Sequence, residues 1–210
     1  MTDPVDELST KQKYVLFFDF CSSTLIIEDL IRTESQERWR NLLIGIKKFL
    51  VEEREIHGFE IYKFIGDGWI LLFDKDFSPS ILFSLLKRLC DKYDKAFNKH
   101  IRGILSTDID TIGITFGLDR GSLIKIVMDG RREYIGRPLN VAARLQGSIK
   151  DNDSSPQGKV LMSNIVYDYV KQDIRNEYLI YKVRRKLGNI SGGERYQAKK
   201  LMLYEKPKRA

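Results

Sequence analysis

The feature that most constrains this chain is an acidic turn between two apolar runs, within residues 61–73. Apolar side chains lead up to the tripeptide Gly-Asp-Gly at 66–68 and resume directly after it. Glycine readily adopts the positive φ angles of a tight turn, so the pattern predicts a β-hairpin with strands at about 59–65 and 69–74. An aspartate in a turn most often serves only to form it, by hydrogen-bonding its own backbone.

A second acid makes a functional interpretation of this turn more attractive. Residues 14–20 read as a buried strand, and Asp19 is the one charged residue in that run. A carboxylate there costs free energy unless a cation or hydrogen-bond donors meet it. Two strand-borne carboxylates side by side form an oxygen-only pocket suited to Mg²⁺ or Mn²⁺. We therefore predict that Asp19 and Asp67 lie together.

Length and composition indicate one large domain with a sizeable core, because the chain has 210 residues and is 42% hydrophobic. No apolar run reaches the roughly 18 residues of a membrane span, and the acidic N-terminus is unlike a secretory signal. Cys21 and Cys90 lack metal-ligand spacing, which suits a reducing cytoplasm. We expect a cytoplasmic protein with a leader at 1–12, a single domain at 13–205 and a basic tail at 206–210.

Positive charge is concentrated near the end of the chain. The net charge is +7, and residues 171–210 hold twelve Lys and Arg against four Asp and Glu. Such a segment fits nucleic-acid phosphates, a small polyphosphate or simply an exposed surface, which is the commonest case. It lacks the interleaved aromatic platforms of single-strand binders. We therefore expect no stable binding to nucleic acid or to a membrane.

The remaining periodicities predict a β-α-β-β-α-β order. Helical patterns cover about 25–56, with a break near 33–35, and about 78–102. Strands at 111–117 and 122–127 are predicted to pair around a turn at 119–121. The fold class is therefore α+β, with a ferredoxin-like core of antiparallel strands.

A C-terminal β/α extension follows this core. A charged loop at 129–133 leads to a helix that starts at Pro138 and ends near Ile149, because proline fits the first helical turn. After a loop at 150–158, the predicted elements are a strand at 159–162, a helix at 163–172 and strands at about 178–184 and 199–204.

Small polar residues follow the first strand, at Ser22, Ser23 and Thr24. Serine and threonine are good N-cap residues, so a helix is predicted to begin there. The free backbone N–H groups of a helix start form a natural cradle for phosphate. These three residues are therefore predicted to contact a substrate phosphate.

Four stretches resemble the motifs of the class III nucleotidyl cyclases, the adenylate and guanylate cyclase superfamily. They are Phe-Asp-Phe-Cys-Ser-Ser-Thr at 18–24, Lys-Phe-Ile-Gly-Asp-Gly at 63–68, Tyr-Ile-Gly at 134–136 and Asn-Val-Ala-Ala-Arg at 140–144. Each alone is common, but together they occur in the family's order over residues 13–170. The resemblance implies a lyase that converts a nucleoside triphosphate into a 3′,5′-cyclic nucleotide and pyrophosphate.

The resemblance also implies roles for individual residues. Asp19, Asp67 and the backbone carbonyl of Phe20 would bind two divalent cations, Mn²⁺ or Mg²⁺, which lower the pKa of the ribose hydroxyl and neutralise the departing pyrophosphate. Asn140 would orient the ribose. Arg144 lies one helical turn later on the same face and would stabilise charge on the α-phosphate; otherwise it is a surface ion-pair residue.

Family members place the two carboxylates on one subunit and the Asn/Arg pair on the other. The resemblance therefore implies a head-to-tail homodimer with two equivalent sites. The family also uses a lysine from its C-terminal segment on the triphosphate, for which Lys186 is the candidate, with Arg184 and Arg185 nearby.

The positions that select the base in this family fall on Lys63 and Glu133, next to Tyr134 as a further substrate contact. A lysine donor with an acidic acceptor suits adenine, cytosine and uracil alike, whereas guanine needs a different arrangement. The pair therefore argues against guanine but does not choose among the other three bases. The base therefore stays open on this evidence.

Two features favour a pyrimidine. We expect a short stand-alone enzyme without a regulatory domain. Aromatic residues near the selector positions would shrink a purine pocket, namely Tyr62, Phe64, Trp69 and Tyr134. Both features are similar to the bacterial antiphage Pycsar pyrimidine cyclases, whose product activates a separate effector protein. We expect UTP to be converted to cyclic UMP. The alternatives are a cytidylate cyclase, an adenylate cyclase or an inactive nucleotide-binding homologue.

Overall fold

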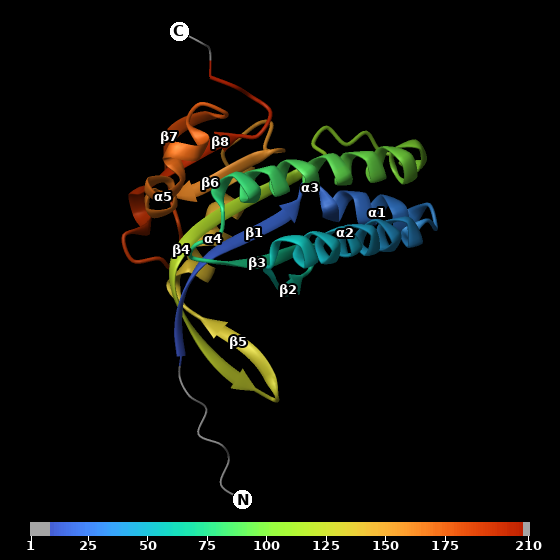
Figure 1. The fold of residues 1–210 in the computed structure, drawn as a ribbon. Coiled ribbons are helices and arrows are strands. Elements are labelled where there is room, and N and C mark those ends of the chain that lie inside the picture. Colours follow the sequence, from blue (N-terminus) through green and yellow to red (C-terminus); the bar gives the residue numbers. More distant parts are fainter. Residues whose placement is uncertain (1–8, 208–210) are drawn as a thin grey trace, which may run out of the picture.

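The structure is a computed structural model, and it describes residues 9–207 (Figure 1). Within that range the strands form one sheet: β1 (Ser9–Phe20), β2 (Glu60–Ile65), β3 (Gly68–Asp74), β4 (Ile114–Met128), β5 (Arg131–Ile135), β6 (Lys159–Ser163), β7 (Leu179–Arg185) and β8 (Tyr196–Met202). The α-helices are α1 (Ser23–Arg32), α2 (Gln36–His57), α3 (Pro79–His100), α4 (Arg137–Lys150) and α5 (Asn164–Ile174). Short 3₁₀ helices occupy Arg102–Ile104 and Gly193–Arg195.

The ferredoxin-like core is confirmed. Its four strands lie in the order β2-β3-β1-β4, and each neighbouring pair is antiparallel. The predicted extension continues the same sheet, because β6 pairs in parallel with β4 and is followed by β8 and the edge strand β7. The result is a mixed α+β fold built on one continuous sheet.

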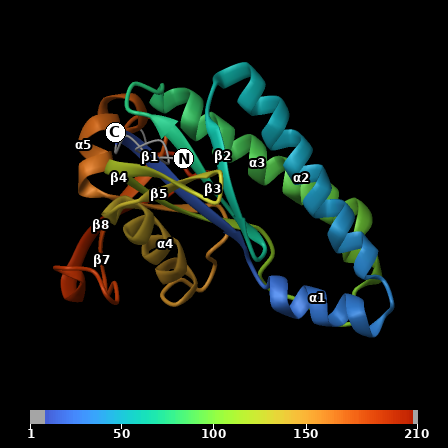
Figure 2. The same ribbon diagram turned by 90° about the horizontal axis from the view of Figure 1, so that it is seen from below.

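Helices cover both faces of the sheet. The largest hydrophobic cluster joins one face to α1, α2, α3 and α5, whereas α4 packs on the opposite face, as Figure 2 shows for α2, α3 and α4. Side chains alternate along a strand. In β1, Phe18 and Phe20 therefore enter the larger cluster, while Val15 and Phe17 pack with the smaller one under α4. The same alternation places Asp19 on the α4 face.

The predicted turn at 119–121 is wrong. These residues lie inside β4, where Asp119 pairs with Val15 of β1 and Gly121 pairs with Lys13. Gly121 is required for packing, because a Cβ atom there would lie 2.9 Å from Cγ of Pro138 at the start of α4. The apparent turn signal is therefore a site of close helix–strand approach.

The actual reversal comes ten residues later, at Asp129 and Gly130, whose φ angles of 50° and 69° are typical of a two-residue hairpin turn. Glu133, predicted in a charged loop, lies in β5 and pairs with Ile126. The β4–β5 hairpin projects away from the body of the sheet (Figure 1). Its cross-strand pairing is a tertiary outcome that the local charge pattern does not reveal.

The boundaries of other elements differ in smaller ways. Residues 9–12, expected in the leader, belong to β1 and pair with β4; residues 1–8 and 208–210 lie outside the described range. The break near 33–35 is confirmed, since α1 ends at Arg32 and α2 begins at Gln36. No helix in the described part of the chain is long and apolar enough to cross a membrane.

Candidate functional site

Asp19 and Asp67 come from adjacent structural elements. Asp19 is the penultimate residue of β1, and Asp67 lies in the turn between β2 and β3. The turn approaches β1 closely, because a Cβ atom on Gly68 would lie 2.2 Å from the carbonyl oxygen of Phe18. Only glycine permits this approach, and it brings the two carboxyl groups to one place.

The electrostatics of this pair favour a bound cation. Burial raises the pKa of the Asp19 carboxyl, the Lys150 ammonium opposes that effect, and the neighbouring Asp67 carboxyl adds to it. Asp19 Oδ1 and Asp67 Oδ2 are buried and accept no hydrogen bond from any described residue. Within residues 9–207 there is no group of three or more His, Cys, Asp or Glu side chains placed for a metal. The donor set is therefore two carboxylates plus backbone oxygen, a hard set that fits Mg²⁺ or Mn²⁺.

Sequence analysis missed Lys150, the last residue of α4. Its Nζ lies 2.7 Å from Asp19 Oδ2 and donates a hydrogen bond to the Phe20 carbonyl oxygen over 2.8 Å. An ammonium group thus contacts two of the oxygens assigned to the cations. The contact joins residues 131 positions apart, and no local pattern in the sequence signals it.

The polar segment after β1 begins α1 as predicted, but Ser22 does not cap it in the expected way. Ser22 adopts a left-handed conformation with φ 55°, and its side chain forms no capping hydrogen bond. The N–H groups of the first turn are therefore not covered by a side-chain cap. This leaves the backbone from Ser22 to Thr24 available as the predicted phosphate cradle.

The two predicted base selectors meet directly. Lys63 Nζ lies 2.7 Å from Glu133 Oε2, and the hydroxyl of Tyr62 donates to the same oxygen over 2.5 Å. The pairing of β2 with β3 shifts register between Ile61 and Lys63. Such a bulge re-aims side chains, which explains how two successive residues reach one carboxylate.

Tyr62 is in turn held by the backbone N–H of Tyr134, which donates to its hydroxyl oxygen over 3.0 Å. The Tyr134 hydroxyl donates to Glu60 Oε2 over 3.1 Å. The hydrogen bonds from Lys63 and then Tyr62 lower the pKa of Glu133. A hollow of about 630 Å³ opens beside this group, and Tyr62, Lys63, Glu133 and Tyr134 are among its lining residues.

The four aromatic residues predicted near the base do not share one pocket. Phe64 and Trp69 line a separate apolar hollow against Leu43 and Ile44 of α2. Trp69 also stacks on Phe18 in the main core, with ring centroids 5.4 Å apart. Strand alternation and the bulge separate the two pairs, so Tyr62 and Tyr134 alone flank the selectors.

Asn140 and Arg144 are exposed on α4, one turn apart. In the described range, neither side chain forms a hydrogen bond or ion pair with Asp19 or Asp67, and neither lines the hollow beside Glu133. The helix thus presents the pair to solvent. Within one chain, the predicted metal ligands Asp19 and Asp67 therefore do not share a site with Asn140 and Arg144.

The predicted C-terminal cations are dispersed. Lys186 is exposed and pairs with Glu194 over 3.1 Å. Arg184 and Arg185 are consecutive in β7 and so face opposite sides of the sheet. Arg185 turns to the α4 side, where its Nη2 lies 3.1 Å from Asp153 Oδ2.

Asp153 is the centre of a cation cluster that sequence analysis did not find. Lys200 Nζ lies 2.5 Å and Lys159 Nζ 3.4 Å from its Oδ1 atom, in addition to the contact with Arg185. Burial alone would raise the pKa of Asp153, but the hydrogen bond from Lys200 and the surrounding positive charges outweigh burial and lower it. The cluster carries more positive than negative charge on the α4 side of the sheet.

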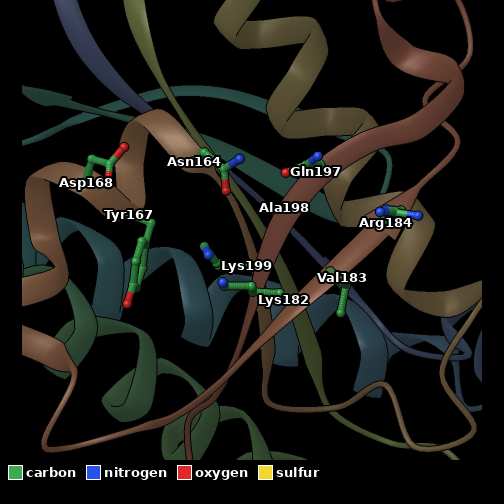
Figure 3. Close-up of a pocket in the computed structure, with 9 residues that line it drawn as sticks. All are labelled: Asn164, Tyr167, Asp168, Lys182, Val183, Arg184, Gln197, Ala198 and Lys199. Atoms are coloured by element: carbon green, nitrogen blue, oxygen red, sulfur yellow. The ribbon is translucent and has the colours of Figure 1, made fainter.

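Arg184 belongs to a different hollow, of about 750 Å³, between the start of α5 and the β7–β8 pair (Figure 3). Lys182 and Lys199 are register partners across these strands and also line it. Lys199 Nζ lies 4.7 Å from the centroid of the Tyr167 ring. This basic hollow is on the face opposite α4 and contains none of the predicted catalytic or metal-binding residues.

Comparisons with known proteins establish the fold. No family model matches the chain, and no curated protein matches it in sequence. Among solved structures, the adenylyl cyclase CyaB from P. aeruginosa is similar with a TM-score of 0.71 and 19% identity, over 97% of this chain and 99% of that one.

Two further solved structures agree. The guanylyl cyclase Cya2 gives a TM-score of 0.64 at 14% identity, over 92% of this chain and 93% of that one. An adenylate/guanylate cyclase/hydrolase from Silicibacter pomeroyi gives 0.59 at 18% identity, over 96% of this chain and 99% of that one. The chain therefore has the fold of class III adenylyl and guanylyl cyclase catalytic domains.

Proposed function

We propose that this protein is a nucleotidyl cyclase that converts a nucleoside triphosphate into a 3′,5′-cyclic nucleotide and pyrophosphate. In this reaction the ribose 3′-oxygen forms a bond to the α-phosphorus, the bond from that phosphorus to the bridging oxygen breaks, and the hydroxyl proton leaves to solvent. The observation that carries the proposal is the half-buried pair Asp19 and Asp67, each with one buried oxygen that lacks a donor. The cyclase fold of the solved neighbours supports it.

Asp19, Asp67 and the Phe20 carbonyl are the residues that would hold two divalent cations. When bound, these cations lower the pKa of the 3′-hydroxyl and neutralise charge on the pyrophosphate. The chain itself supplies the position of the carboxylates, through the close contact of Gly68 with β1. The uncapped N–H groups after Ser22 would receive phosphate oxygens.

Asn140 and Arg144 would act on the other end of the substrate. Asn140 would orient the ribose, and Arg144 would stabilise charge on the α-phosphate in the transition state. Both are exposed and separated from the carboxylate pair within one chain. A head-to-tail homodimer, in which each site takes its carboxylates from one copy and its Asn/Arg pair from the other, unites them.

We propose UTP as the preferred substrate. Lys63 Nζ and the Tyr62 hydroxyl both contact the Glu133 carboxylate, so this group offers an adjacent donor and acceptor beside the hollow. Uracil matches such a pair through O4 and N3–H. Cytosine and adenine present comparable edges, so cyclic CMP and cyclic AMP are the alternative products.

Cyclic UMP would then serve as a second messenger of the bacterial antiphage Pycsar type and act on a separate effector protein. This role rests on the sequence resemblance described above. For the triphosphate, Lys186 remains the predicted C-terminal contact. Its exposed pairing with Glu194 leaves it free to move toward a ligand, because exposed ion pairs are weak.

The decisive experiment is a product assay. Purified protein is incubated with Mn²⁺ and with ATP, GTP, CTP or UTP separately, and products are identified by chromatography and mass. A cyclic UMP peak that disappears in Asp67→Ala supports the cyclase reaction, the choice of base and the role of Asp67. Cyclic CMP or cyclic AMP retains the mechanism and overturns the base assignment. Absence of product from all four nucleotides contradicts the cyclase assignment.

A further inference from the structure

Lys150 occupies a position that the proposed function leaves unexplained. It is the last residue of α4, and its ammonium contacts Asp19 Oδ2 at 2.7 Å and the Phe20 carbonyl oxygen at 2.8 Å. These oxygens belong to a side chain and to the main chain of consecutive residues. A single ammonium therefore bridges the end of β1 as a small cation would.

The site needs a positive charge when no metal ion is bound. Asp19 is 22% exposed at its side chain, and the Asp67 carboxyl lies next to it with a buried oxygen that has no donor. Two adjacent carboxylates repel each other when both are ionised and partly removed from water. Among the described residues, Lys150 is the one that forms a salt bridge with this pair, through Asp19.

We propose that Lys150 is a built-in placeholder for the divalent cation, which holds the ligand oxygens together in the metal-free protein and must leave when the cation binds. This inference rests on the proposed function, because it takes Asp19 and Phe20 as metal ligands. Its physical basis is that the Lys150 ammonium already donates to the Asp19 carboxylate and the Phe20 carbonyl, and a divalent ion bound to the same two residues would be repelled by this charge at close range.

The position of Lys150 suits release as well as binding. The side chain is 32% exposed and lies at the end of α4, so the ammonium is already close to solvent when it leaves the two oxygens. Lysine has a long flexible stem with a compact charge, whereas arginine would hold the carboxylate by two parallel hydrogen bonds. The free energy needed to break the two Lys150 contacts therefore lowers the affinity for the metal ion and raises the metal concentration at which it binds.

The test measures Mn²⁺ binding to the full chain without nucleotide, by the electron paramagnetic resonance signal of free Mn²⁺. Lys150→Met should bind Mn²⁺ about tenfold more tightly than the unmodified protein, the scale of one charge-assisted hydrogen bond. Without metal, Lys150→Met should also melt at a lower temperature than the unmodified protein. Added Mn²⁺ should raise the melting temperature of Lys150→Met by more than that of the unmodified protein. Lys150→Arg should bind Mn²⁺ more weakly than Lys150→Met.

The matched control is Lys171→Met, which removes an equally charged residue that pairs with Asp168 on α5, far along the chain from the carboxylates. It should leave Mn²⁺ affinity unchanged. Equal affinity in Lys150→Met and the control overturns the placeholder role. Weaker Mn²⁺ binding in a folded Lys150→Met also overturns it, since the lysine then supports the metal. Lys150→Gln serves if Lys150→Met does not fold.

Failure of the placeholder role is separable from failure of the proposed function. Asp67→Asn should abolish Mn²⁺ binding in both the unmodified and the Lys150→Met background. If Mn²⁺ binding persists undiminished in Asp67→Asn, the metal site itself is assigned wrongly. If Asp67→Asn loses binding while Lys150→Met equals the control, the metal site stands and the placeholder inference alone fails.

Discussion

The hydroxyl of Tyr62 donates a 2.5 Å hydrogen bond to Glu133 Oε2, the oxygen that Lys63 Nζ also contacts. The two residues come from β2 and from the projecting β4–β5 hairpin, which lie far apart in the sequence. Tyr62 therefore positions the predicted base acceptor. It does so because the bulge in β2 turns it toward the same side as Lys63.

Tyr62→Phe tests this positioning role. The variant keeps the ring and loses the hydrogen bond, so kcat/KM for the preferred nucleotide should fall about tenfold, the usual scale of a hydrogen bond to a charged group. Discrimination among UTP, CTP and ATP should weaken, with little change in melting temperature. Tyr181→Phe, at an exposed tyrosine on β7, is the control. Unaltered discrimination in Tyr62→Phe would show that the tyrosine does not position the acceptor.

Asp67→Ala tests the carboxylate pair. Turnover should drop by at least about a hundredfold, as when a main electrostatic contributor to an active site is removed. The dimer and the melting temperature should persist, because Asp67 sits at a hairpin tip outside the core clusters. Asp76→Ala removes an exposed acid after β3 as the control. An active Asp67→Ala enzyme would refute the assignment of this residue to the metal.

A mixture of Arg144→Ala and Asp19→Ala tests the shared site. Each variant alone should be inactive, because both sites of its dimer are incomplete. Random exchange of subunits places both defects in one site of each heterodimer and leaves the other site intact, so about a quarter of normal activity should return. Native mass spectrometry can verify the exchange. Lack of recovery despite mixed dimers would exclude a site divided between subunits in this way.

Asp29 provides a pH-dependent test of stability. Its side chain is 1% exposed and accepts hydrogen bonds from the backbone N–H and hydroxyl of Ser106, from Thr107 and from Arg32. These bonds, led by the Ser106 hydroxyl, hold the pKa of Asp29 well below its usual value. The ionised Asp29 therefore stabilises the fold fully above about pH 3.9, the pKa of an aspartate in the unfolded chain. This stabilisation is lost as the pH falls toward the lower pKa of Asp29 in the folded protein.

Urea unfolding at several pH values measures this contribution. Asp29→Asn should be less stable than the unmodified protein at neutral pH, and the difference should shrink as the pH drops below about 4. The exposed Asp168→Asn on α5 is the comparison variant. The free energies of unfolding of Asp29→Asn and of the unmodified protein could instead differ by the same amount down to the lowest measurable pH. That result would contradict a stabilising role for the ionised Asp29 carboxylate.

Local patterns were sufficient for much of the fold. Alternating and helical periodicities located the β-α-β-β-α-β order, and the apolar runs around Gly-Asp-Gly identified the hairpin that carries Asp67. They failed at 119–121 because an Asp-Arg-Gly stretch has the composition of a turn while its pairing with β1 is decided by distant residues. Gly121 lacks a Cβ atom that would clash with Pro138, and this steric requirement is visible only in the packed structure.

The sequence by itself determined most of the helices and strands and which side chains are candidates for the site, because helix and strand periodicity, turn glycines and short motifs are properties of neighbouring residues. Only the tertiary structure decided which of those side chains meet. Lys150 reaches Asp19 across 131 positions, and Tyr62 reaches Glu133 across 71. Such contacts follow from sheet register, from a bulge and from the face on which α4 packs, and these depend on the whole chain folding at once.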